Sequence, residues 1–169
     1  MIFFKNTYLC ITLSLTALAT SAFAHEYKKG TLIIDHPITR ETPPGTSVGA
    51  GYLSITNNST EDDKLIKITG DLSPVIQIHT MSLENNVIRM EQIKEGLVIP
   101  AGKSVQLQPG GKHLMFMNLP QQLKVGEKHK VVLIFEKAGE IEVTFNVEKH
   151  NTEDTKHNKS TEQTKHKHH

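Results

Sequence analysis

The chain has 169 residues, a length that fits one ordinary domain with a tail. Its 19 Lys and Arg residues nearly balance its 18 Asp and Glu residues, which gives a net charge of +1 at pH 7. Nothing in this balance favours nucleic-acid binding, because that function needs a basic face. The sole cysteine, Cys10, lies close to the N-terminus, so the rest of the chain can form neither a disulfide nor a thiolate metal site.

The N-terminal residues 1–24 have the pattern of a secretory signal peptide. A lysine near the start is followed by an apolar run at residues 9–18, and Ala22-Phe-Ala24 fits a small-x-small cleavage site. The run is too short and too interrupted to span a membrane. Cys10 lacks the small residues that would precede a lipid-attachment site. We therefore expect a periplasmic mature chain that begins at His25 and has no membrane span; a retained anchor is the alternative.

Residues 25–149 read as a series of short strands separated by turn residues. The strands alternate apolar and polar residues or are rich in β-branched side chains, and no long stretch has a helical period. They are Thr31–Asp35, Gly49–Thr56, Lys64–Thr69, Val75–Thr80, Ser104–Gln108, Lys130–Glu136 and Ile141–Val147. A hairpin at residues 137–140 joins the last two. This spacing predicts a single all-β domain, a small β-sandwich or barrel.

Residues 150–169 differ in composition from the domain. They contain no apolar residue larger than threonine, so they cannot bury a core, and we expect a disordered tail. The tail is rich in histidine, a composition typical of metal binding. Its histidines are His150, His157, His166, His168 and His169. We interpret them as a secondary site for Cu(II) or Zn(II). An expression tag is the alternative, although the sequence is not a plain hexahistidine.

Two histidines and two methionines carry most of the functional information, namely His79, Met90, His113 and Met115. If residues 113–117 form a strand, His113, Met115 and Met117 share one face, and the large apolar residues between them face the core. Met90 follows His79 by eleven positions, close enough for a hairpin or loop to bring it back. Methionine alone usually fills gaps in a core. Its clustering with two histidines at a period of two favours a metal site.

The donor atoms of this set suit Cu(I). Thioether sulfur is a soft ligand that selects Cu(I), and imidazole binds several later transition metals. Thioethers form no disulfides and need no deprotonation, which suits a compartment that oxidises thiols. Four neutral ligands leave a site of charge +1 with Cu(I), and burying this smaller charge costs less than burying Cu(II). Zinc is a poor match because it prefers Cys, His and carboxylate ligands.

The sequence around these residues closely resembles the periplasmic copper chaperones of the PCuAC type. The resemblance extends from about His25 to Val147 and includes Gly49-Ala-Gly-Tyr52, Ile99-Pro-Ala-Gly102 and Pro109-Gly-Gly111. The family pattern is His, ten residues, Met, about 21 residues, then His-x-Met. Here ten residues separate His79 from Met90, and 22 separate Met90 from His113, one more than in the pattern.

This resemblance implies a cupredoxin-like fold and a Cu(I) site formed by His79, Met90, His113 and Met115. It also implies delivery of copper to the binuclear site of cytochrome c oxidase, together with Sco-type thiol proteins. Some family members carry histidine-rich C-terminal extensions that bind Cu(II). We expect the protein to act as a monomer and as a carrier, not an enzyme.

Three further residues are secondary candidates. Met81 and Met117 each lie two positions from a ligand candidate, where they either pack around the site or serve as alternative thioethers. His25, as the first mature residue, could chelate Cu(II) through its α-amine and imidazole. His36 and His129 are interpreted as structural or surface histidines.

Three other functions compete with a copper carrier. A blue-copper electron carrier is disfavoured because such sites need a Cys thiolate. An interaction module whose methionines only fill the core would bind no copper above the level of its tail. Periplasmic storage or detoxification of copper would use the same site but would not pass the metal on.

Overall fold

The computed structural model describes residues 26–85 and 87–150, and within them every regular element is a strand. The eleven strands are β1 (Glu26–Lys29), β2 (Leu32–Arg40), β3 (Val48–Asn57), β4 (Asp63–Gly70), β5 (Val75–Glu84), β6 (Val87–Gln92), β7 (Leu97–Ile99), β8 (Lys103–Leu107), β9 (His113–Met117), β10 (Lys128–Phe135) and β11 (Gly139–Glu148). The all-β prediction is confirmed, and each strand expected from the sequence is present. No helix in the described part could cross a membrane.

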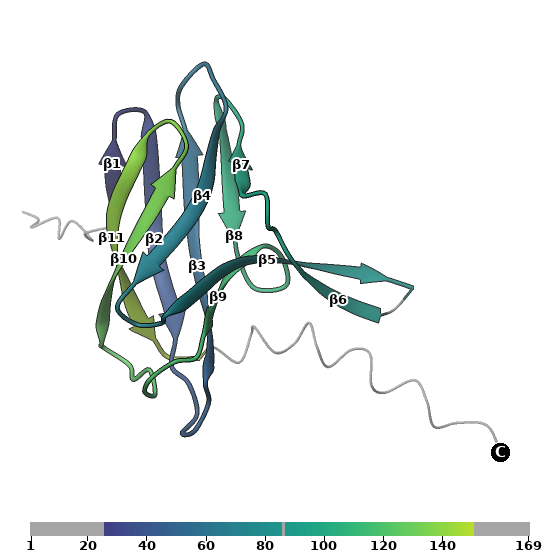
Figure 1. Ribbon diagram of the computed structural model, residues 1–169, viewed down its shortest axis with the longest axis vertical. Coiled ribbons are helices and arrows are strands. Elements are labelled where there is room, and N and C mark those ends of the chain that lie inside the picture. Colours follow the sequence, from purple (N-terminus) through teal and green to yellow (C-terminus); the bar gives the residue numbers. More distant parts are fainter. Residues whose placement is uncertain (1–25, 86, 151–169) are drawn as a thin grey trace, which may run out of the picture.

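The strands form one continuous hydrogen-bonded sheet in the order β6-β5-β9-β3-β2-β11-β10-β4-β7, with β1 paired to β2 and β8 to β3. Among these pairs, β11 with β2 is parallel, and the others are antiparallel. The long strand β3 divides one edge between two partners: its first half pairs with β9 and its second half with β8. The β5–β6 hairpin extends away from the body as an arm (Figure 1).

The alternation seen in the sequence produces the core. On β11, Ile141, Val143, Phe145 and Val147 are all buried. Phe145 meets the ring of Phe116 from β9 edge to face, with centroids 5.7 Å apart and planes at 89°. Each fully buried apolar side chain of this size contributes about 1.5–3 kcal/mol. This packing fixes β9 against the body, and with it the outward face of that strand.

Three strands were not predicted from the sequence, and two were predicted too short: β2 continues beyond the expected Asp35 to Arg40. β5 continues from Thr80 to Glu84, and β6 returns alongside it. All six residues of β6 are exposed, so this strand has no buried face to impose alternation. β1 and β7 have only four and three residues, too few for a pattern to emerge.

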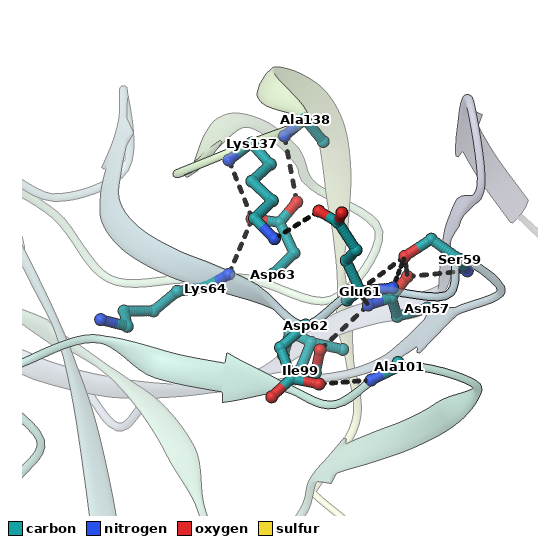
Figure 2. A network of polar contacts seen from close by, with 10 residues as sticks. All are labelled: Asn57, Ser59, Glu61, Asp62, Asp63, Lys64, Ile99, Ala101, Lys137 and Ala138. Carbon is teal, nitrogen blue, oxygen red and sulfur yellow. Dashed lines mark hydrogen bonds and ion pairs between the residues drawn. The ribbon is translucent and has the colours of Figure 1, made fainter.

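A buried carboxylate holds the β10–β11 turn against the start of β4 (Figure 2). Asp63 is 6% exposed. Its Oδ1 accepts hydrogen bonds from the backbone N–H groups of Lys64 (2.7 Å) and Lys137 (2.9 Å), and its Oδ2 accepts one from that of Ala138 (3.0 Å). Hydrogen bonds to a charged acceptor contribute about 1.5–3 kcal/mol. The network therefore anchors this turn without involving the histidine and methionine candidates.

Candidate metal centre

Strands β5 and β9 place two of the candidate residues directly opposite each other. The antiparallel register pairs His79 with His113, and their ring centroids lie 5.9 Å apart with the planes tilted by 42°. Side chains opposite each other on neighbouring strands point to the same face of a sheet. The two imidazoles therefore form a pair on the outward face of the β5–β9 ladder.

The residues of β9 alternate as the sequence predicted. Leu114 and Phe116 are fully buried in the core. Met115 and Met117 are half-buried on the opposite face, which they share with His113. His113 is itself only 4% exposed. The face that carries the histidine pair is thus sheltered, although it points away from the core.

The two candidate methionines lie on opposite sides of the histidine pair. Met115 pairs with Gln77 on β5, and Met90 on the arm pairs with Met81. Both positions are diagonal to His79, a relation that separates Cα atoms by about 7–8 Å. Met115 and Met90 therefore lie at opposite diagonals of His79, Met115 on β9 and Met90 on the arm. Met90 is 46% exposed.

The backbone carbonyl of Gly111 orients the imidazole of His113. It lies 3.0 Å from His113 Nδ1 and also accepts the backbone N–H of Met81, at 3.2 Å. A carbonyl oxygen can only accept, so His113 Nδ1 carries the proton. The lone pair of the neutral ring therefore resides on Nε2, the nitrogen left for a metal. Such a hydrogen bond on the far nitrogen is the usual support of a metal-binding histidine.

His79 has a corresponding support from a side chain. Its Nε2 lies 2.9 Å from the Oε1 atom of Gln77, which can only accept, so Nε2 carries the proton. Its Nδ1 is buried and has no hydrogen-bond partner among the described residues. A buried acceptor without a partner costs about 1–3 kcal/mol. A metal ion would satisfy this atom, so the residues present fit a metal site.

The electrostatic environment favours the neutral form of His79. Burial, and after it the electrostatic effect of the neighbouring His113, lowers the pKa of the His79 imidazole below its ordinary value of 6.5. A neutral imidazole is the form that binds metals. Among the described residues, no three His, Cys, Asp or Glu side chains come together as a metal site. A site here therefore needs thioether ligands, a donor set that is soft and suited to Cu(I).

The other predicted candidates lie elsewhere. Met81 is half-buried opposite Met90, and Met117 pairs with Val75, farther from the histidine pair than Met115 is. His150 is exposed, and its backbone N–H donates to Glu41 Oε1 at 3.3 Å. His25, His157, His166, His168 and His169 lie outside the described residues, as do the predicted signal peptide and the rest of the tail.

The two structural histidines have separate environments. His129 is largely buried between two carboxylates, with Nδ1 3.7 Å from Asp71 and Nε2 3.5 Å from Glu127. His36 is exposed at a bulge of β2, where its φ is 50°.

Sequence reasoning missed Gln77 and the carbonyl of Gly111. The available signal for Gln77 was its position two residues before His79, on the same strand face.

Comparisons with known proteins identify the class. The solved structure of a copper-bound PCuAC domain from PmoF2 matches with a TM-score of 0.64 and 27% identity, over 75% of this chain and 99% of that one. The solution structure of CuI-DR1885 from Deinococcus radiodurans matches with a TM-score of 0.57 and 26% identity, over 77% and 85%. The fold is therefore that of the cupredoxin-like PCuAC domains, as the sequence resemblance predicted.

A family model described as "Putative lipoprotein LpqE-like" matches residues 32–147. The chain belongs to this LpqE-like family, which is of the PCuAC type. A curated relative, "Putative lipoprotein Lxx21020" of Leifsonia xyli subsp. xyli (strain CTCB07), is 31% identical over 91 residues, or 54% of this chain and 55% of the relative. The chain thus spans about half the length of that relative. Both descriptions are of lipoproteins and fit a protein of the cell envelope.

Proposed function

We propose that this protein is a periplasmic copper carrier. It binds one Cu(I) ion through His79, His113, Met115 and Met90, and it passes the ion to a thiol-containing acceptor. The acceptor would be a Sco-type protein or the copper site of cytochrome c oxidase. The protein performs no reaction on the metal, so the copper is its cargo.

One observation carries this proposal: the buried Nδ1 of His79 has no partner among the described residues, and its ring lies beside that of His113. The imidazoles of His79 and His113 each offer a nitrogen lone pair from neighbouring strands, and the thioethers of Met115 and Met90 lie at the two diagonals of His79. Together they form a neutral and soft donor set. The solved relatives from PmoF2 and Deinococcus radiodurans hold copper in the same fold, which supports the same cargo here.

The position of Met90 suits a carrier that must release its metal. Met90 lies on an arm strand with exposed apolar neighbours, Leu83 at 66% and Ile88 at 51%. A ligand at the surface can be replaced by an incoming donor while the less exposed His79 and His113 stay in place. A thiolate is a stronger soft base than a thioether. Copper therefore moves downhill from this protein to a reduced dithiol.

The test is an anaerobic titration with Cu(I) against a competing chelator, on the full chain and on a shortened chain that ends at Lys149. We expect one tight Cu(I) in both. His79→Asn should weaken binding strongly. His36→Asn is the matched control, because it removes an exposed histidine at a position of positive φ that asparagine tolerates. Absence of tight Cu(I) binding in the shortened chain would contradict the proposal.

A transfer assay separates a carrier from a storage protein. The Cu(I)-loaded protein is mixed, without oxygen, with a reduced dithiol protein, and the two are then separated. A carrier loses its copper to the dithiol at equilibrium. Retention of copper would favour storage or detoxification.

A further inference from the structure

Gln77 lies beside two ligand candidates, Met115 and His79, although it is not a ligand candidate itself. It pairs with Met115 across the β5–β9 ladder, and its side-chain oxygen accepts a hydrogen bond from His79 Nε2 at 2.9 Å. The amide stands on the same face as the histidine pair, two residues before His79. Like His79, it is half-buried.

The hydrogen bond decides which nitrogen of His79 can bind a metal. With Nε2 protonated, the lone pair is on Nδ1, the atom that is buried and without a partner among the described residues. If the ring rotated by half a turn about its Cβ–Cγ bond, Nε2 would exchange places with Cε1 and Nδ1 with Cδ2, so the hydrogen bond to Gln77 would be lost. His113 has the opposite arrangement, because the carbonyl of Gly111 holds the proton on Nδ1 and leaves Nε2 available.

We propose that Gln77 is a positioning residue that fixes the Nε2-protonated tautomer of His79, so that His79 presents Nδ1 and His113 presents Nε2 to the copper ion. The inference rests on the proposed function, because it concerns how that same site is organised. Supports of this kind orient the ring and raise the basicity of the ligand, and their loss typically weakens metal binding about 10–100-fold.

The structure offers a matched control for Gln77. Gln92 pairs with His79 from the other side, on β6, but its side chain makes no hydrogen bond to a described residue. Both glutamines are therefore close neighbours of His79 in the sheet, and of the two only Gln77 hydrogen-bonds to its ring. Gln77→Leu removes the hydrogen-bond acceptor of His79 at similar volume, and Gln77→Glu keeps an acceptor there. Gln92→Leu makes the same change as Gln77→Leu at the neighbouring glutamine that has no hydrogen bond to His79.

The first measurement is made on the metal-free protein. Nitrogen NMR of histidine-labelled protein, at a pH where the imidazoles are neutral, reports which nitrogen of each ring is protonated. We expect His79 protonated on Nε2 and His113 on Nδ1 in the wild type and in Gln92→Leu. In Gln77→Leu, His79 should become a mixture of tautomers while His113 keeps its own. An Nδ1-protonated His79 in the wild type would overturn the inference.

The second measurement is Cu(I) affinity by chelator competition, with the thermal midpoint of each variant as a check that it folds. Gln77→Leu should bind about 10–100-fold more weakly, Gln77→Glu should restore binding, and Gln92→Leu should match the wild type. If Gln77→Leu is folded and binds as the wild type does, the inference is wrong and the copper site stands. If the wild type itself binds no Cu(I), the proposed function falls, and this inference falls with it.

Discussion

Replacing Met90 by leucine should separate a ligand role from a packing role. Leucine keeps the volume and apolarity of methionine but lacks the thioether. Because Met90 is 46% exposed on an arm strand, the swap should change the free energy of unfolding by less than about 0.5 kcal/mol. Loss of one of four donors should weaken Cu(I) binding at least tenfold, which corresponds to about 1.4 kcal/mol.

Met117→Leu is the matched control, because it makes the same chemical change farther from the histidine pair, opposite Val75. Both variants are measured by chelator competition under anaerobic conditions and by chemical denaturation. Met117→Leu should bind Cu(I) as the wild type does. An unchanged affinity in Met90→Leu would refute the reasoning and return Met90 to a packing role. If only Met81→Leu loses affinity, the arm supplies a different thioether, the one directly opposite Met90.

Three further outcomes follow from the structure. The His79 pKa is lowered in the folded state, so the unfolded chain takes up the proton first, and the free energy of unfolding of the metal-free protein should fall as the pH drops below about 6.5. Denaturation at several pH values measures this dependence, which should be smaller in His79→Gln. An equal pH dependence in the two proteins would contradict the assignment to His79. Gly51→Ala should destabilise the fold by about 1–3 kcal/mol, because the new Cβ would lie 2.5 Å from the ring of Phe116, and an unchanged denaturation midpoint would mean that this ring can move aside. Removal of residues 150–169 should leave one tight Cu(I) and reduce the number of Cu(II) ions bound, as counted by titration; loss of the Cu(I) site would place that site in the tail.

Much of the fold could be predicted from the sequence because strand formation follows a local pattern. The period of two in residues 141–147 predicted both the strand and its buried face, and the same reasoning placed Leu114 and Phe116 in the core. The pattern failed at β6, where all six residues are exposed and neither face is selected by burial. A strand of this kind exists because β5 offers it backbone partners.

The sequence by itself determined the chemistry of the candidate site, through the types of its donor residues and their common strand face. Only the tertiary structure decided the pairing of His79 with His113, the placement of Met90 and Met115 at opposite diagonals, and the nitrogen that each imidazole leaves unprotonated. The reason is physical. The direction of a side chain in a strand depends on its nearest neighbours in the chain. Register and tautomer depend on hydrogen bonds between β5, β6 and β9, and the last of these strands begins more than twenty residues after the arm ends.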